Sequence, residues 1–326
     1  MKFIVIGGMS EYKNHQKILT PIPADFDVPL LRNERLGYHY TGIEKLKSIV
    51  ESRQLWFSSL ADVNDSAEIA DGVAVFTDFI RKRTRRDDWK SDLWENLRKE
   101  TIEGSLATHF VFCLTLDEDS LPMWSLYAGN TDGCCIGFNY SNLIDSLLIK
   151  NFELLKGGQF SFGFMVYNRN EKIRIFKTFL KACGNAAQSS CAKFFNKEIE
   201  EVPIKSPMWP ESFHYYENSE DKIRRFSNGF PDFAFFKNRT FRYENELRIV
   251  VRIPRERQEE LEKLGKIRKD GNKRFLCLDF DLARSVKRIY SAPKAPQILR
   301  EEILMMTKTV SDLRNVRIWA SSSTIR

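Results

Sequence analysis

Short β-forming segments recur along this 326-residue chain, and they constrain its fold more than any other feature. They are rich in β-branched and aromatic residues, and several end at turn or helix-cap residues. We expect strands over residues 38–42, 54–59, 108–114, 134–138, 164–167, 247–253, 275–280, 286–290 and 316–319. A chain with this pattern folds around a sheet of many short strands.

Helical patterns lie between these segments but do not alternate with them one for one. Apolar residues at helical spacing predict helices over residues 43–50, about 66–106, about 173–195 and about 296–308. Because the helices are bunched between strands, the sequence predicts an α+β fold and not a doubly wound one. We expect a loosely structured lead-in over residues 1–35. Residues 36–326 are expected to form a single domain, with a mainly helical or loop insert around 140–235.

Composition excludes several broad classes of protein. The chain carries 51 Lys and Arg against 44 Asp and Glu, a formal net charge of +7, and 42% of its residues are hydrophobic. These values exclude collagen-like, wholly disordered and low-complexity proteins. No apolar run reaches the roughly 18 residues of a membrane span, and the first residues do not resemble a signal peptide. We therefore expect a cytoplasmic protein without a membrane partner, with reduced cysteines and, from its four scattered histidines, no metal.

Because of two basic runs, nucleic acid stays among the candidate partners of this chain. Arg81–Arg86 holds five positive charges in six residues, and a sparser run extends from Lys266 to Arg274. Such runs can neutralise phosphates. Taken singly, each is more typical of a solvated helix face or a turn.

The first polar segment is His39-Tyr40-Thr41. On a strand, His39 and Thr41 project to one face and Tyr40 to the other, and a histidine beside a hydroxyl can hold a ribose or an amide. Ser58 and Ser59 form a second polar pair at a strand end. Taken singly, these segments are more typical of a half-buried histidine and of ordinary loop chemistry.

Two carboxylates form the third polar segment. Glu244 and Glu246 stand at the head of a predicted strand that continues with Arg248. Residues at i and i+2 of a strand share a face, so we expect the two carboxylates side by side. The two carboxylates of such a pair can have different catalytic roles: one stabilises a developing cation and the other accepts a proton. The alternative is a solvated strand end neutralised by Arg242 and Arg248. The common nucleotide, protease and esterase signatures are absent from the chain.

Five motifs, taken together and in order, resemble a bacterial family of unknown-function domains. They are a Y-H-Y-T strand, an N-D-x-x-E turn, an M-W-x-x-Y block that runs on to I-G-F, an E-x-E-x-R strand and a late I-Y-x-x-P. In this chain they stand at residues 38–41, 64–68, 123–138, 244–248 and 289–293. Two neighbouring positions depart from the family's usual pattern: Ser66 stands where it often has Pro, and Phe241 where it often has Trp.

The pattern is also similar, more distantly, to ADP-ribosyltransferases. In that superfamily an H-x-S/T strand grips NAD, and a later strand carries a catalytic Glu, often as E-x-E. The resemblance implies a split, twisted β-sandwich core decorated with helices, with NAD in the cleft between its halves. It assigns catalysis to Glu246 and Glu244. The NAD-binding residues that it implies are Tyr38, His39, Tyr40, Thr41, Ser58, Ser59 and Arg248.

The same resemblance implies a glycosyl-transfer mechanism with NAD as the substrate. Glu246 would stabilise the oxocarbenium ion formed as the nicotinamide–ribose bond breaks, and Glu244 would activate the acceptor. The motifs do not specify the acceptor, but the basic runs and the net charge favour RNA or DNA over protein. We expect such a modifier to act as a toxin or phage-defence effector, with an antitoxin or activator protein as a further partner.

Two other classes of function stay open from the sequence. The same fold can serve as a non-catalytic ligand-binding or sensor module. Alternatively, Asp65, Glu68, Glu244 and Glu246 can hold Mg²⁺ in a nuclease. Within the NAD hypothesis, water as the nucleophile would give an NAD glycohydrolase.

Overall fold

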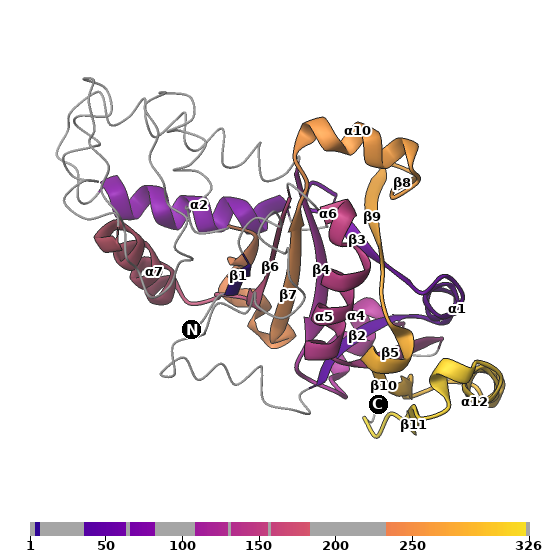
Figure 1. Cartoon of the computed structure of the whole chain (residues 1–326). Coiled ribbons are helices and arrows are strands. Elements are labelled where there is room, and N and C mark those ends of the chain that lie inside the picture. Colours follow the sequence, from indigo (N-terminus) through magenta and orange to yellow (C-terminus); the bar gives the residue numbers. More distant parts are fainter. Residues whose placement is uncertain are drawn as a thin grey trace, which may run out of the picture.

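The computed structural model describes residues 4–6, 36–62, 66–81, 108–129, 132–155, 158–182 and 233–323. These residues form a mixed α/β fold around one twisted, open β-sheet (Figure 1). Its strands are β1 (Ile4–Ile6), β2 (Leu36–Gly42), β3 (Gln54–Ser59), β4 (His109–Thr115), β5 (Gly133–Asn139), β6 (Gln159–Phe164), β7 (Glu246–Arg252), β8 (Ile267–Asp270), β9 (Lys273–Asp279), β10 (Val286–Ser291) and β11 (Arg317–Ala320).

Helices cover both faces and the edges of this sheet. They are α1 (Ile43–Ser52), α2 (Ser66–Arg81), α4 (Leu121–Tyr127), α5 (Tyr140–Lys150), α6 (Phe152–Leu155), α7 (Arg169–Ala182), α10 (Arg255–Lys263), α11 (Leu282–Ser285) and α12 (Gln297–Thr309). Short 3-10 helices are η3 (Phe233–Phe235), η4 (Arg239–Glu244) and η5 (Ser311–Leu313). None of the helices in the described ranges is long and apolar enough to cross a lipid bilayer.

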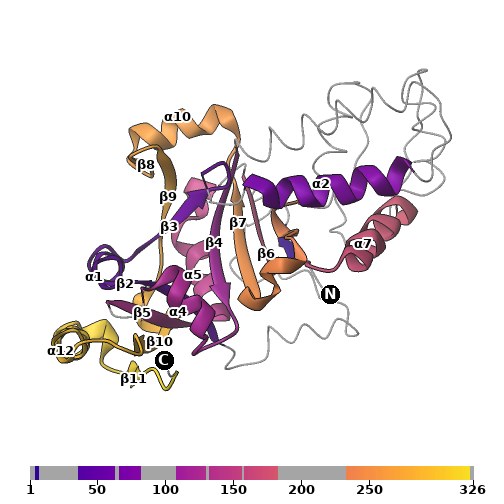
Figure 2. The same cartoon turned by 180° about the vertical axis from the view of Figure 1, so that it is seen from behind.

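One strand, β4, carries two arms of the sheet. Along one edge β4 pairs with β7 over its whole length, and the order continues through β6 to β1. On its other edge the first arm, β2-β5-β10-β11, joins where Tyr38 pairs with Thr115. The second arm, β3-β9-β8, joins where Ser58 pairs with Val111. The arms therefore leave β4 at opposite ends and diverge, as both views show (Figures 1 and 2).

The larger hydrophobic core lies on one face of β4 and β7. Alternation along β7 sends Leu247 and Ile249 into this core, whereas Glu246 and Arg248 project to the opposite face. Phe112 of β4 pairs with Ile249 and enters the same core. The apolar face of the sheet therefore consists of every second residue on each of these strands.

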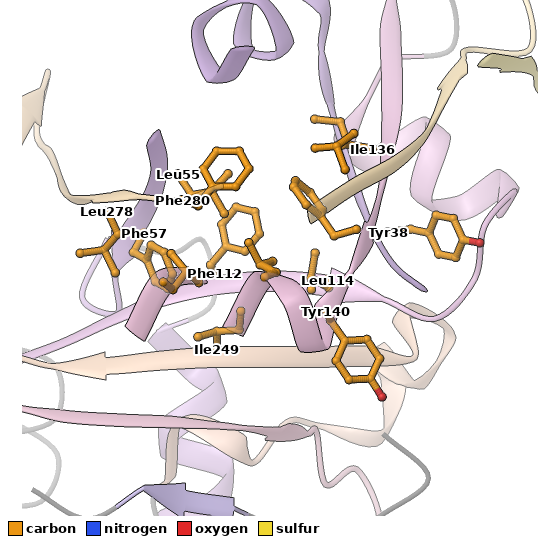
Figure 3. Close-up of a cluster of buried hydrophobic side chains, with 14 of the residues drawn as sticks. Tyr38, Leu55, Phe57, Phe112, Leu114, Ile136, Tyr140, Ile249, Leu278 and Phe280 are labelled. Atoms are coloured by element: carbon orange, nitrogen blue, oxygen red, sulfur yellow. The ribbon is translucent and has the colours of Figure 1, made fainter. Parts of the chain in front are cut away.

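Helix α5 closes this core between the two arms. It begins after Asn139, whose side chain accepts a hydrogen bond from the Asn142 N–H as an N-cap. The helix contacts β5 of the first arm and β9 of the second. Figure 3 shows the packing, with Phe57 and Phe280 grouped near Phe112. The divergence of the arms is thus filled by apolar side chains.

Helices α2 and α7 lie beside each other over the opposite face (Figures 1 and 2). Phe76 of α2 packs edge-on against Phe233 of η3, with ring centroids 6.1 Å apart. Val250 of β7 and Ile175 of α7 belong to the same buried cluster. This second, smaller core borders the polar side chains of β7.

Most predicted strands are observed within about two residues, but other elements differ. The strand expected over 164–167 is β6, which lies earlier because Phe160 and Phe162 alternate into the core. Helix α2 is described only to Arg81, so the rest of the helix expected to residue 106 lies outside the described residues. Of the expected lead-in, only residues 4–6 are described, and they form β1. In the region expected as an insert, the described residues include α5 and the sheet strand β6.

Candidate functional site

The two carboxylates of the E-x-E motif come from different elements. Glu244 ends the 3-10 helix η4, Asn245 adopts the left-handed conformation with φ 42° and ψ 50°, and Glu246 begins β7. The expectation that both lie on one strand was therefore wrong. The tight turn at Asn245 nevertheless brings the two side chains together, because both reach one lysine.

Lys237 binds both carboxylates. Its Nζ lies 2.6 Å from Glu244 Oε2 and 3.2 Å from Glu246 Oε2. The other oxygen of Glu246, Oε1, accepts a hydrogen bond of 2.7 Å from Arg248 Nε. All four side chains are at most 5% exposed. Two buried negative charges thus face two buried positive charges, the arrangement that offsets the cost of removing ions from water.

The surroundings separate the pKa values of the two glutamates. Burial alone raises the pKa of Glu246, but Arg248 and Lys237 outweigh it and lower that pKa to about 2. Burial also raises the pKa of Glu244, and there it prevails over the opposing effect of Lys237. Glu246 is therefore a fixed anion, whereas Glu244 is the carboxylate that accepts a proton more readily.

Further polar groups hold this cluster in place. The Tyr127 hydroxyl donates to Glu244 Oε1 at 2.8 Å, and the Tyr167 hydroxyl accepts from the backbone N–H of Glu246 at 3.0 Å. Lys172, only 1% exposed, donates to the Lys237 carbonyl at 2.8 Å and pairs with Asp71. Helices α2 and α7 are thereby tied to the acidic pair.

Sequence reasoning did not find Lys237 or Lys172. Lys237 lies seven residues before Glu244 in a stretch that also contains two arginines. Lys172 lies on a helix that contains four other lysine or arginine residues. Neither residue belongs to a recognisable motif, and only the folded chain brings them to the glutamates. The observation that two nearby carboxylates need positive partners was the one available signal.

His39 and Thr41 project away from the acidic pair. The His39 ring stacks on Phe112, with centroids 4.6 Å apart, and its Nδ1 lies 3.0 Å from the Cys113 carbonyl oxygen. The Cys113 side chain, next along β4, instead contacts Glu246. Because neighbouring residues of a strand point to opposite faces, the ring of His39 and the carboxylate of Glu246 lie on opposite faces of the sheet. Burial lowers the pKa of His39 to about 4.

Tyr38 and Tyr40 share the sheet face of Glu246. Cross-strand pairing links Tyr38 to Thr115 and Thr115 to Glu246 in one row. The Tyr38 hydroxyl donates to Glu118 Oε2 at 2.7 Å. The Tyr40 hydroxyl donates to the Asp117 carbonyl at 3.0 Å, so both tyrosines contact the loop between β4 and α4.

Ser58 and Ser59 lie on the second arm. They pair with Val111 and Phe110, whereas Glu246 pairs with Thr115 at the other end of β4. Four residues of β-strand separate the two positions, about 13 Å. The structure does not bring these serines to the acidic pair.

The residues of the proposed magnesium site are only partly described. Asp65 lies outside the described residues, and so does the side chain of Glu68. Within the part of the chain that the structure describes, no group of three or more His, Cys, Asp or Glu side chains is arranged to hold a metal ion. The oxygens of Glu244 and Glu246 accept hydrogen bonds from Lys237, Arg248 and Tyr127.

Comparison with known proteins gives one family match. Residues 123–249 match a family described as "Protein of unknown function (DUF2971)". This range begins at Met123 of the M-W-x-x-Y motif and ends one residue beyond Arg248 of the E-x-E-x-R motif, and it covers less than half of the chain. The match supports a relation to a family of unknown-function domains. No curated protein and no solved structure matches the chain.

Proposed function

We propose that the protein is an NAD-dependent ADP-ribosyltransferase in which Glu246 and Glu244 carry the chemistry. The observation that supports this most strongly is the buried acidic pair, whose pKa values are displaced in opposite directions. Divergent pKa values in adjacent carboxylates are typical of sites that need one permanent anion and one proton acceptor.

Each glutamate has a distinct part in the proposed reaction. The C–N bond between ribose and nicotinamide breaks, and nicotinamide leaves with the bonding electrons. The fixed negative charge of Glu246 stabilises the oxocarbenium ion that remains. The acceptor oxygen or nitrogen then forms a bond to the same ribose carbon, and its proton passes to Glu244. Tyr127, bonded to Glu244 and 46% exposed, supplies an aromatic face beside this pair.

The proposal does not depend on His39. Its ring lies against Phe112 on the other face of the sheet, so it has no assigned contact with the substrate. Tyr38 and Tyr40 lie on the face of the acidic pair and stay in the proposal as NAD-binding residues. Arg248 acts by holding Glu246 ionised.

We further propose nucleic acid as the acceptor. The second basic run folds into the β8–β9 hairpin, where Arg268, Lys269 and Lys273 are exposed. The Arg268 guanidinium lies 5.8 Å from the centroid of the Trp56 ring. Cations interleaved with aromatic rings suit phosphates and bases together. A toxin or phage-defence role for such a modifier is part of this proposal, together with a regulating antitoxin or activator protein.

A binding module is the second candidate, and one observation favours it. Both carboxylates are at most 4% exposed and are matched by the charges of Lys237 and Arg248. Buried, neutralised carboxylates can serve a purely structural purpose. NAD binding without release of nicotinamide would support this candidate.

The test is transfer of labelled ADP-ribose from NAD in cell extract, followed by nuclease or protease digestion. We expect a labelled product that nuclease removes, and at least a hundredfold loss of transfer in Glu246→Gln. Glu244→Gln is the second variant, because glutamine keeps the shape of the side chain but cannot take up the proton that the acceptor releases. Glu301→Gln on α12 is the matched control, since Glu301 is exposed and α12 packs against β10 and β11, which the sheet order separates from β7 by three strands or more.

Each outcome of this experiment has a defined meaning. Label that only protease removes would replace nucleic acid with protein as the acceptor. Folded protein that gives neither label nor free nicotinamide would contradict the transferase and favour the binding module. The thermal unfolding of each variant shows whether lost activity reflects lost structure.

A further inference from the structure

A second polar cluster lies on the sheet face of Glu246, towards the outer edge of the first arm. Three donors converge on Oε2 of Glu118: the Tyr38 hydroxyl at 2.7 Å, Arg288 Nη1 at 2.8 Å and the Tyr290 hydroxyl at 3.2 Å. Both tyrosines are buried on strands, whereas Glu118 belongs to the loop before α4 and its side chain is 51% exposed. The donors are thus held by strands of the sheet, whereas the carboxylate that they bind belongs to a loop.

The sheet register explains how these donors reach one point. Arg288, Gly137, Tyr38, Thr115 and Glu246 form a continuous row of cross-strand partners. A Cβ atom at Gly137 would lie 3.1 Å from the Tyr38 ring and 3.2 Å from Arg288. The glycine therefore leaves room for the two long side chains that flank it.

This cluster carries more positive charge than the single negative charge of Glu118 offsets. Arg317 on β11 is the direct register partner of Arg288 on β10. Like charges directly opposite each other destabilise a pair of strands. Among the described residues, the acid paired with Arg288 is Glu118, and Arg317 has no ion pair. An anion with two negative charges would match both arginines.

An exposed aromatic ring lies next to these arginines. Trp319 is the register partner of Tyr290 and is 49% exposed. Ile318, between Arg317 and Trp319, packs against the core, so Arg317 and Trp319 share the opposite face with Tyr290. Bases of nucleotides stack on exposed indole rings.

We propose that Arg288, Arg317, Tyr38 and Tyr290 bind the phosphates of a nucleoside diphosphate, whose base stacks on Trp319. The Glu118 carboxylate occupies the phosphate position in this structure. The phosphate oxygens would take the three donors that Glu118 now holds, and the two guanidinium groups would neutralise them. Because Glu118 lies on a loop, its side chain can move away from the donors. Its displacement costs the three hydrogen bonds that Glu118 Oε2 now accepts.

Nucleotide binding at this site is a separate property from the proposed transferase activity, because binding is measured without turnover. Where the nucleotide is NAD, the inference rests on the proposed function. In that case the register places Tyr38 two strands from Glu246, about 10 Å away on the same face. The ADP half of NAD would lie over the first arm, with the reacting ribose towards β7.

The experiment is isothermal titration of the full chain with ADP, inorganic pyrophosphate and adenosine. Glu118→Gln removes the competing charge, and we expect it to bind ADP about tenfold tighter than the wild type. We expect Arg288→Gln and Arg317→Gln to weaken binding of both ADP and pyrophosphate by about tenfold or more. Trp319→Ala is expected to weaken ADP binding and leave pyrophosphate unchanged. Arg284→Gln, an exposed arginine just before β10, is the matched control.

Two results would overturn the inference. Absence of ADP binding in both the wild type and Glu118→Gln would eliminate the site. Equal binding of ADP and pyrophosphate, unchanged by Trp319→Ala, would leave a phosphate site and contradict the nucleotide. If Arg288→Gln does not fold, Arg317 and Trp319 keep the test decisive, because both are exposed at the sheet edge. A failure here is distinct from absent transfer, which is read from nicotinamide release.

Discussion

Asn245 makes the acidic pair possible through its backbone. Its φ of 42° ends η4 and lets β7 begin at the next residue, so that Glu244 and Glu246 approach Lys237 from two directions. Asparagine adopts this left-handed conformation more easily than other residues that carry a Cβ atom. The Asn245 side chain also donates to Asp117 Oδ1 at 3.1 Å.

We expect replacement of Asn245 to separate its backbone role from its side-chain role. Asn245→Gly keeps the conformation and loses only the contact with Asp117, so its cost in unfolding free energy should be below about 1 kcal/mol. Asn245→Val forces a β-branched residue into the left-handed region, and we expect a loss of about 2 kcal/mol or more. Urea unfolding measures both. Equal stability of the two variants would contradict the backbone role.

The neutral ring of His39 gives a prediction about pH. Its pKa in the folded protein is about 4, against 6.5 for an ordinary histidine. Well above pH 6.5 the ring is neutral in both folded and unfolded chains. As the pH falls from 6.5 towards 4, the unfolded chain binds a proton that the folded chain does not, so stability falls. Between pH 7 and pH 5 we expect His39 to contribute a loss of about 2 kcal/mol.

Urea unfolding at these two pH values tests this expectation. The variant His39→Gln lacks the titrating ring and should lose correspondingly less stability between pH 7 and pH 5. An identical loss in wild type and variant would show that His39 is not the group responsible.

At the scale of elements, Gly72 controls how closely α2 approaches η3. A Cβ atom there would lie 2.9 Å from Phe233 Cδ1 and 3.0 Å from Phe236 Cβ. Alanine is normally the better helix former by about 1 kcal/mol. We expect the opposite sign here, with Gly72→Ala destabilising the protein by about 1–3 kcal/mol through overpacking.

The control for Gly72 lies in the same helix. Ala74 is exposed, so Ala74→Gly should show the ordinary helix cost of about 1 kcal/mol. Both variants are measured by chemical unfolding. A stabilising Gly72→Ala would mean that α2 can move away from η3 without loss.

Elements were predictable where local pattern determines them. β4, β5 and β7 carry apolar, β-forming runs, and their positions follow from those residues alone. Glu244 was assigned to a strand because a period of two fits E-x-E, and nothing in that period reveals a left-handed turn at Asn245. Lys237 joins the site through tertiary contacts, which a local pattern does not contain.

At the scale of the whole molecule, an ion pair and a hydrogen bond in series join the outer helices to the sheet. Asp71 of α2 pairs with Lys172 of α7, and Lys172 in turn holds the Lys237 carbonyl. Lys172→Met leaves Asp71 without this partner, and Asp71→Asn leaves Lys172 buried and charged. We expect a double-mutant cycle of the two to give a coupling of about 1–3 kcal/mol.

The matched comparison is the pair Arg53 and Asp312, whose side chains are 51% and 31% exposed. Its coupling should be much smaller, because water screens exposed charges. Both couplings are measured by urea unfolding. Comparable values for the two pairs would show that the buried pair joins the helices to the sheet no more strongly than an exposed pair would.

The order of strands could not be predicted from local patterns, although the mixed α/β class could. Nothing in the residues of β4 states that one edge serves two arms. Its partners in β2, β3 and β7 come from residues 36–59 and 246–252, far apart along the chain. Such pairings depend on the folded arrangement as a whole, and so did the position of His39 relative to Glu246.

The shared strand β4 also determines the order in which this protein can assemble. Neither arm can join the sheet until residues 109–115 form the extended strand β4. Strand β7, which pairs with β4 along its whole length, lies more than 130 residues further along the chain. Closing such long loops is entropically costly and slow. On the ribosome, β2 and β3 emerge before β4, and the strands with which they pair over most of their length, β5 and β9, emerge later still, so each arm completes its pairing only after β4 has been made.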